Sequence, residues 1–212
     1  MDPDIKKASV AVIDEAGKVE SIFLSKICNK AGRSARDSMV IQMRQIIAYS
    51  AYLPCYCGEE YTAVMEGQRY LGGKSTANPQ DLIHLGQMGA FLLGVVSGDR
   101  SGVWDPPSEI KIPYPQEWKG SLAKRIHHTQ ICSSLGLSYT VRKNPGKDIV
   151  PDLNPTTEMN VVGMQSTAKP QKLNPGDWTD IMDSIGLANW ARIDYLKTGL
   201  KNKYLAMARG ES

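Results

Sequence analysis

A β-hairpin followed by alternating helices and strands is the feature that most constrains the fold of this 212-residue chain. Residues 8–14 and 19–25 are two β-rich runs, and the stretch 15–18 between them is typical of a turn. Helical and strand-like segments then alternate along the rest of the sequence. This order predicts an α/β fold in which a mixed β-sheet is flanked by helices.

The elements after the hairpin are predicted from the spacing of apolar residues. Helices are predicted at residues 35–52, 79–96 and 122–135. Strands are predicted at residues 61–65 and 108–113. A further helix is predicted from Asp177, as its cap, to about residue 195, and Gly199 is expected to separate it from a short basic C-terminal helix.

Residues 137–176 have several prolines and little periodicity. Because a long segment without regular structure is uncommon inside a compact domain, this one is predicted to be an irregular insertion that is functional or mobile. The length of the chain fits one domain, and residues 1–212 are therefore assigned to a single domain that contains this insertion.

The predicted helix at 79–96 is apolar on more than one side. Its apolar residues are Leu82, Leu85, Met88, Leu92 and Val96 on one stripe, with Phe91 and Val95 beside it. A helix with so wide an apolar face should pack on the sheet and also on something else, and a second protomer is a reasonable candidate. Gly86, Gly89 and Gly94 would permit another backbone to approach closely.

Composition favours a soluble, reduced, cytoplasmic protein. No apolar run approaches the roughly 20 residues that a membrane span needs, so no membrane partner is expected. The four cysteines lack the pattern of a disulfide framework, and Cys55 and Cys57 have no second Cys or His pair that would favour zinc. The net charge is only +3, with basic stretches at 119–125 and 197–203. These stretches suit a polyanionic substrate or are simply solvated helix faces.

Four carboxylates stand where hydrophobic elements begin or end, namely Asp2, Glu66, Asp180 and Asp183. Hard oxygen ligands of this kind bind Mg²⁺ in nucleases that cleave phosphodiesters. Glu66 ends a predicted strand, and the following Gly67 would let a ligand approach closely. Asp180 and Asp183 share one helix face. The alternative is that Asp180 is an ordinary first-turn acid, an explanation that fits Asp183 less well because it lies beyond that turn.

These residues belong to an ordered series of motifs. The series is Asp2-Pro3, the hairpin, Val64-Met-Glu66-Gly67-Gln68, Pro115-Gln-Glu-Trp-Lys119-Gly and Asp180-Ile-Met-Asp183-Ser-Ile-Gly-Leu-Ala188. It resembles the RuvC-type Holliday junction resolvases, in particular their phage and prophage members, over nearly the whole chain and least over 137–176. The resemblance implies an RNase H-like fold and a homodimer that makes paired symmetric nicks across a four-way DNA junction, in the bacterial host cytoplasm if the protein is phage-encoded.

The resemblance also implies roles for single residues. Asp2, Glu66, Asp180 and Asp183 would bind two Mg²⁺ ions, for which Mn²⁺ could substitute. Lys124 and Lys119 would lie beside the catalytic site and contact DNA, with exposed helix residues as the alternative. Arg69 and Tyr70 would contact DNA, with Tyr70 either stacking on an unpaired base or covering the sheet edge. His127 and His128 are left out because histidines are softer ligands than Mg²⁺ prefers.

Two departures from the family pattern concern Asp2. Asp4 stands where the family usually has glycine, and only Met1 precedes Asp2 where the family has a central strand. Without that strand, unpaired backbone and a poorly fixed Asp2 are expected. The missing strand keeps a non-catalytic DNA-binding module open. A broader RNase H-fold nuclease that acts on forks, flaps or RNA–DNA hybrids is a second alternative, because phage relatives could act on more than four-way junctions.

Overall fold

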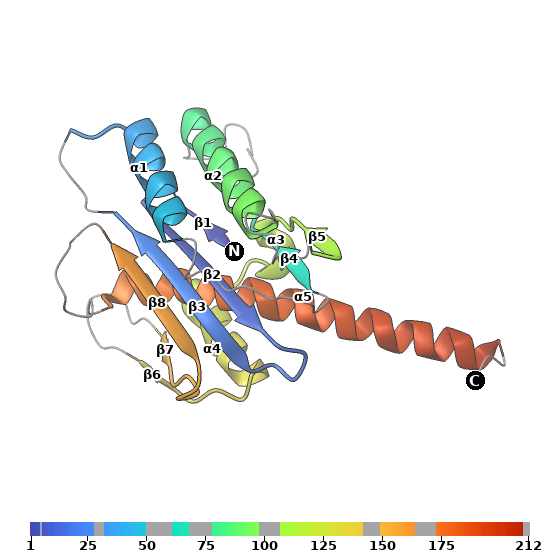
Figure 1. Ribbon diagram of the computed structural model, residues 1–212. Helices are drawn as coiled ribbons and strands as arrows, with labels where there is room; N and C mark the ends of the chain where they lie inside the picture. The colour runs from blue at the N-terminus through green and yellow to red at the C-terminus, as the bar shows by residue number, and fades with distance from the viewer. Residues whose placement is uncertain are drawn as a thin grey trace.

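The computed structural model describes residues 1–4, 6–27, 32–49, 61–67, 78–97, 107–141, 149–163 and 173–209. The strands are β1 (Asp2–Pro3), β2 (Lys7–Ile13), β3 (Val19–Lys26), β4 (Thr62–Val64), β5 (Glu109–Lys111), β6 (Tyr139–Val141), β7 (Ile149–Pro151) and β8 (Glu158–Gly163). The helices are α1 (Ala35–Ala48), α2 (Pro79–Ser97), α3 (Pro115–Trp118), α4 (Lys124–Ser134) and α5 (Pro175–Ala208). The predicted α/β class, with a mixed sheet flanked by helices, is confirmed (Figure 1).

The main sheet has the strand order β1-β2-β3-β8. Strands β1, β2 and β3 are antiparallel, and β8 is parallel to β3. The predicted hairpin is confirmed as β2 and β3, whose register pairs Ser9 with Leu24. Its turn is closed by a hydrogen bond from the Asp14 N–H to the Lys18 carbonyl, and Gly17 has a φ of 93°. This backbone conformation favours glycine because a side chain would be strained there.

Strand β1 connects the main sheet to the β4–β5 pair. Asp2 is paired with Ser9 of β2. On the other side, the Met1 nitrogen donates to the Val64 carbonyl at 2.7 Å, and the Glu66 N–H donates to the Met1 carbonyl at 3.2 Å. These two bonds follow the pattern of a parallel ladder. The expectation of unpaired backbone and a poorly fixed Asp2 is therefore wrong, because the short strand is paired on both sides.

Helices cover both faces of the main sheet (Figure 1). Alternate residues of β2 and β3 point to opposite faces, as the pleat of a strand requires. Phe23 packs with helices α1 and α2, in a cluster that includes Ile46, Met88 and Leu92. Ile22 and Leu24 pack on the other face with Ile131 of α4 and with Ile181, Met182 and Ile185 of α5. The carboxylate-bearing part of α5 is thus fixed by the core.

Helix α2 confirms the helix predicted at 79–96. Met88, Leu92 and Val95 are buried in the core, whereas Ile83 is 53% exposed. Ile83 lies outside the predicted apolar face, on which Leu82 and Leu85 are half-buried. The pairing of α2 with a second protomer stays a prediction. Within the described ranges, no helix has both the length and the apolar character that are needed to cross a bilayer.

The C-terminal elements differ from the predictions in two ways. Helix α5 is continuous through Gly199, so the predicted break is wrong, because one glycine costs a helix only about 1 kcal/mol. Asp177 is also not the cap. Asn174 Oδ1 accepts a hydrogen bond from the Asp177 N–H, and an Asp177 carboxylate oxygen accepts one from the Asn174 N–H. This reciprocal pair is a capping box with Pro175 in the first turn.

The segment 137–176 is not a structureless insertion. Strands β6 and β7 form an antiparallel pair, and β8 adds an edge to the main sheet. The short helix α3 was not predicted either. Four other elements are confirmed with shorter bounds than predicted: α1 ends at Ala48, β4 covers Thr62–Val64, β5 covers Glu109–Lys111 and α4 covers Lys124–Ser134.

Candidate metal and catalytic site

The four predicted carboxylates come from three separate parts of the fold. Asp2 lies on β1, Glu66 lies two residues after the end of β4, and Asp180 and Asp183 lie on α5, which contacts both strands. The pKa of Asp2 is raised well above its ordinary value by burial, and further by the charges of Asp183, Glu66 and Asp180. The structure therefore brings together the residues that the sequence singled out, with Asp2 inside the electrostatic field of the other three.

Asp183 is held by two side chains of α4. His128 Nε2 lies 2.8 Å from Oδ1, and Lys124 Nζ lies 2.8 Å from Oδ2. Burial alone would raise the pKa of Asp183, but the hydrogen bond from His128 and the charge of Lys124 lower it below its ordinary value. The side chain of Asp183 is only 6% exposed. A buried carboxylate with two dedicated partners is not the solvent-facing acid of the helix alternative.

Asp180 is fixed to strand β2. Lys7 Nζ lies 3.0 Å from its Oδ2, and the Ser9 hydroxyl donates to its backbone carbonyl at 2.7 Å. The pKa of Asp180 is raised by burial, although Lys7 opposes that shift. The adjacent first-turn acid is Asp177, which is fully buried between Lys26 at 2.8 Å and Lys7 at 3.5 Å. Asp177 therefore has a structural role, because its negative charge lies between two lysines, Lys7 and Lys26, that face each other across β2 and β3.

Glu66 is held from the other side by the Trp-Lys-Gly motif. Trp118 Nε1–H donates to Glu66 Oε2 at 3.0 Å, and Lys119 Nζ lies 3.1 Å from the same oxygen. The Lys119 ammonium also lies 4.7 Å from the centroid of a Trp118 ring. Helix α3 positions this pair, and at its start the Tyr114 N–H donates to the Glu117 carboxylate at 2.6 Å. Trp118 and Lys119 thus orient Glu66 and are not merely exposed residues of a helix.

Lys124 lies among the carboxylates. Burial lowers its pKa, but the charges of Asp183, Asp2 and Asp180 outweigh burial, and the net pKa is raised above the ordinary lysine value. The ammonium group therefore stays protonated at neutral pH. Among the described residues, none donates a hydrogen bond to the Asp2 carboxylate. Unlike Glu66, Asp180 and Asp183, Asp2 therefore has carboxylate oxygens that accept no hydrogen bond from the described residues.

The ligand types fit Mg²⁺, although the side chains do not converge on one point. In the ranges that the structure describes, no three His, Cys, Asp or Glu side chains form a recognisable metal-binding group. Glu66, Asp180 and Asp183 instead contact lysine, histidine or tryptophan. The set nevertheless consists of oxygen donors whose charges repel one another, and such a set favours a small hard cation. Asp2, with Glu66, Asp180 and Asp183 beside it, could hold that cation.

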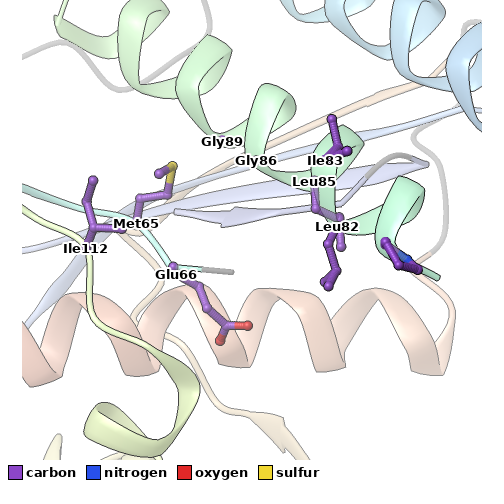
Figure 2. Close-up of a pocket in the computed structure, with 10 residues that line it drawn as sticks. Met65, Glu66, Leu82, Ile83, Leu85, Gly86, Gly89 and Ile112 are labelled. Atoms are coloured by element: carbon purple, nitrogen blue, oxygen red, sulfur yellow. The ribbon is translucent and has the colours of Figure 1, made fainter. Parts of the chain in front are cut away.

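An apolar cleft of about 510 Å³ opens next to Glu66. It is lined by Met65, Ile112 and one side of α2, including Leu82, Ile83 and Leu85 (Figure 2). Figure 2 shows the Glu66 carboxylate pointing toward α5 and away from those apolar side chains. At Gly89 an added Cβ would lie 2.6 Å from Met65 Sδ, so this glycine makes room for a side chain and not for the second backbone that was predicted. At Gly86 and Gly94 an added Cβ would meet nothing within 4 Å.

Comparisons of the chain with protein-family models, with curated proteins and with solved structures found no match. The resemblance to RuvC-type resolvases therefore rests on the sequence motifs alone. The family, and the activity that it implies, stay predictions.

Three side chains that contact the carboxylates were missed from the sequence: Lys7, Trp118 and His128. A signal for His128 existed, because it stands four residues after Lys124 and so shares its helix face. His128 was left out because histidine is a soft metal ligand, but a histidine near a metal site can also orient a carboxylate, as it does here with Asp183. No comparable signal pointed to Lys7, whose partner lies far away in the sequence. Arg69, Tyr70, Cys55 and Cys57 lie outside the described residues, and their predicted roles stay predictions.

Proposed function

We propose that this protein is a Mg²⁺-dependent, structure-selective DNA endonuclease with an RNase H-like fold, which resolves four-way junctions by paired symmetric nicks as a homodimer. The observation that carries the proposal is the grouping of Asp2, Glu66, Asp180 and Asp183 from three parts of the chain, close enough for three of them to raise the pKa of the fourth. Carboxylates whose charges shift one another's pKa in a buried setting are typical of catalytic sites.

The resemblance supplies the substrate class, and the position of Asp2 supports it. The resolvase pattern has its first aspartate on or just after a central strand, and Asp2 lies on β1 between β2 and β4. The alternative of a non-catalytic module was made plausible by the missing strand before Asp2. The pairing of the short β1 with β2, and the bonds of Met1 to Val64 and Glu66, support a fixed Asp2 and so favour the catalytic proposal.

In this proposal each residue has a definable task. Asp2 and the three carboxylates around it would hold Mg²⁺, which, when bound, lowers the pKa of water and stabilises charge on the scissile phosphate. Lys124 and Lys119 supply fixed positive charge where the phosphate would enter. His128 and Trp118 orient Asp183 and Glu66 through hydrogen bonds, and Lys7 fixes Asp180.

A substrate panel tests the proposal. The purified protein is incubated with a four-way junction, a replication fork, a flap and an RNA–DNA hybrid, with Mg²⁺, Mn²⁺ or EDTA. We expect symmetric nicks in opposite strands of the junction with either metal and none with EDTA. A strong preference for the hybrid, or junction binding without nicking in either metal, would contradict the proposal. A monomeric mass at micromolar concentration would contradict the homodimer.

A further inference from the structure

Helix α5 has two parts with different surroundings. Up to Asp194 it is packed on the body, and its last ion pair with the body joins Asp194 to Lys111. Every residue from 195 to 203 is exposed. Figure 1 shows the C-terminal end of α5 extending beyond the sheet and the other helices. Residues 195–208 are called the arm below.

The arm is cationic and has no acidic residue. Its lysines are Lys197, Lys201 and Lys203. Within the described ranges, no salt bridge joins any of these three to a carboxylate, whereas Lys7, Lys119 and Lys124 near the site each contact one. Three exposed lysines on a projecting helix, without a carboxylate partner among the described residues, are an electrostatic match for a polyanion.

Two of these lysines share a helix face with Asp183. Lys201 follows Asp183 by 18 residues, which at 3.6 residues per turn is about five full turns, so both side chains leave the helix in nearly the same direction. Lys197 follows Asp183 by 14 residues and lies within about 40° of that direction. Lys203 lies about 160° away, on the opposite face.

The distance along the helix from Asp183 to the two lysines is shorter than one turn of duplex DNA. At 1.5 Å per residue, Lys197 and Lys201 lie about 21 and 27 Å from Asp183 along the axis. One turn of B-DNA is about 34 Å long. A duplex that leaves the carboxylates along this face would bring phosphates to the two lysines about 6 to 8 base pairs from the scissile phosphate.

We propose that the arm binds the backbone of the duplex flanking the cleavage point, through Lys197 and Lys201. This inference rests on the proposed function, since it takes DNA as the polyanion and the carboxylates as the point from which distance is counted. The continuous α5 then fixes the distance between the carboxylates at one end and the phosphate contacts at the other. The contact is independent of the DNA sequence and requires that the duplex flanking the cleavage point is long enough to reach the two lysines.

The exposed apolar residues of the arm define the rival occupant. Leu200 is 57% exposed and Met207 is 63% exposed, and with Leu196 they form a stripe beside the lysine face. A second copy of α5 could cover that stripe. Charge favours DNA over this pairing, because two arms without acidic residues would repel each other.

Two single-charge variants on opposite faces test the proposal: Lys201→Gln and its matched control Lys203→Gln. Binding to a fluorescent four-way junction is measured by anisotropy over a salt series, with Ca²⁺ in place of Mg²⁺. Junctions with arms of about 15 and about 5 base pairs are compared, since only the longer arms would reach the lysines. Circular dichroism verifies the fold of each variant, and the mass in solution is measured in parallel.

On the long-armed junction, Lys201→Gln should lower the slope of log K against log salt by about 1 and weaken binding roughly tenfold at about 0.1 M salt. Lys203→Gln should keep the wild-type slope, and on short arms Lys201→Gln should bind like the wild type. Equal losses in both variants, a loss that persists on short arms, or no loss would overturn the proposal. So would a change of solution mass in Lys201→Gln, which would identify a protein interface.

Failure of the proposed function looks different. One outcome is that the two variants differ as expected on long and short junctions while the wild type never nicks DNA with Mg²⁺. In that case the contact of Lys197 and Lys201 with DNA stands and the nuclease assignment falls. If the wild type nicks junctions while Lys201→Gln binds unchanged, only the arm contact falls.

Discussion

The packed part of α5 and its arm differ most clearly at two glycines. At Gly186 an added Cβ would lie 2.5 Å from Ile131 Cδ1 and 2.8 Å from Trp118 Cζ3, whereas at Gly199 it would meet nothing within 4 Å. One helix therefore contains two regimes. Tertiary packing determines the packed part, and only helix propensity and solvent act on the arm.

This difference separates two tasks that one helix could perform. Cleavage needs carboxylates held within a fraction of an ångström, and Asp183 lies where Met182 and Ile185 are fully buried. Contact with a phosphate backbone needs positive charge at roughly the right distance and tolerates mobile lysines. Changes in the packed part should thus affect chemistry and stability, while changes in the arm should affect neither strongly.

The largest effect should come from Asp183→Asn. The change removes one proposed metal ligand and a negative charge but no positive surface, so we expect nicking to fall at least about 100-fold, the upper range for loss of a residue that only supports a ligand. Junction affinity and its salt slope should stay at the wild-type level. Single-turnover nicking and anisotropy measure the two quantities. Nicking at nearly the wild-type rate would mean that Asp183 is only a helix acid.

Acid pH should weaken the packed part through His127. Burial first, and then the neighbouring His128, lower the pKa of His127 from 6.5 to about 4. Between pH 6.5 and about pH 4, His127 is therefore protonated in the unfolded chain but neutral in the folded protein. Stability should fall as the pH drops through this window, by up to about 3 kcal/mol at its lower end.

The measurement for His127 is urea unfolding between pH 7 and pH 4, for the wild type and for His127→Gln. Other acids titrate in both proteins, so the difference between the two curves isolates His127. We expect the variant to be the less stable protein at neutral pH, because the edge contact with Trp118 is lost, and the gap to narrow as the pH falls. A gap that is constant with pH would contradict the prediction.

Gly186→Ala should destabilise the packed part by about 1–3 kcal/mol, the usual cost of overpacking a core. The added methyl group must displace Ile131 or Trp118. Because Trp118 donates to Glu66, nicking should fall together with the melting temperature. Thermal unfolding and the nicking assay test both effects. An unchanged melting temperature would show that the packed part is looser than its contacts indicate.

The sequence predicted what is local or strongly patterned. The hairpin follows from two apolar runs and a turn, and the helix at 79–96 follows from its periodicity. The four carboxylates could be selected because Asp2 and Glu66 lie close to strand ends and Asp180 and Asp183 share one face near the start of a helix. Their grouping around Asp2 agrees with that selection.

What the sequence could not show depends on contacts between distant segments. Strand β8 pairs with β3, and the sequence of Glu158–Gly163 alone does not predict this pairing. The ion pair of Lys7 with Asp180 joins residues 173 positions apart. The predicted break at Gly199 failed for the opposite reason, because a local preference of about 1 kcal/mol was treated as decisive.

The smallest effect should come from Gly199→Ala, the counterpart of the change at Gly186. Alanine is favoured over glycine inside a helix by about 1 kcal/mol, and at this position nothing obstructs its methyl group. We therefore expect slightly higher helicity by circular dichroism. The melting temperature should be unchanged or slightly raised, since the arm contributes little to the cooperative core. Unlike Gly186→Ala, this change should leave nicking intact. A loss of stability comparable to that at Gly186 would mean that the arm packs against another surface in solution, and the division of α5 into two regimes would be wrong.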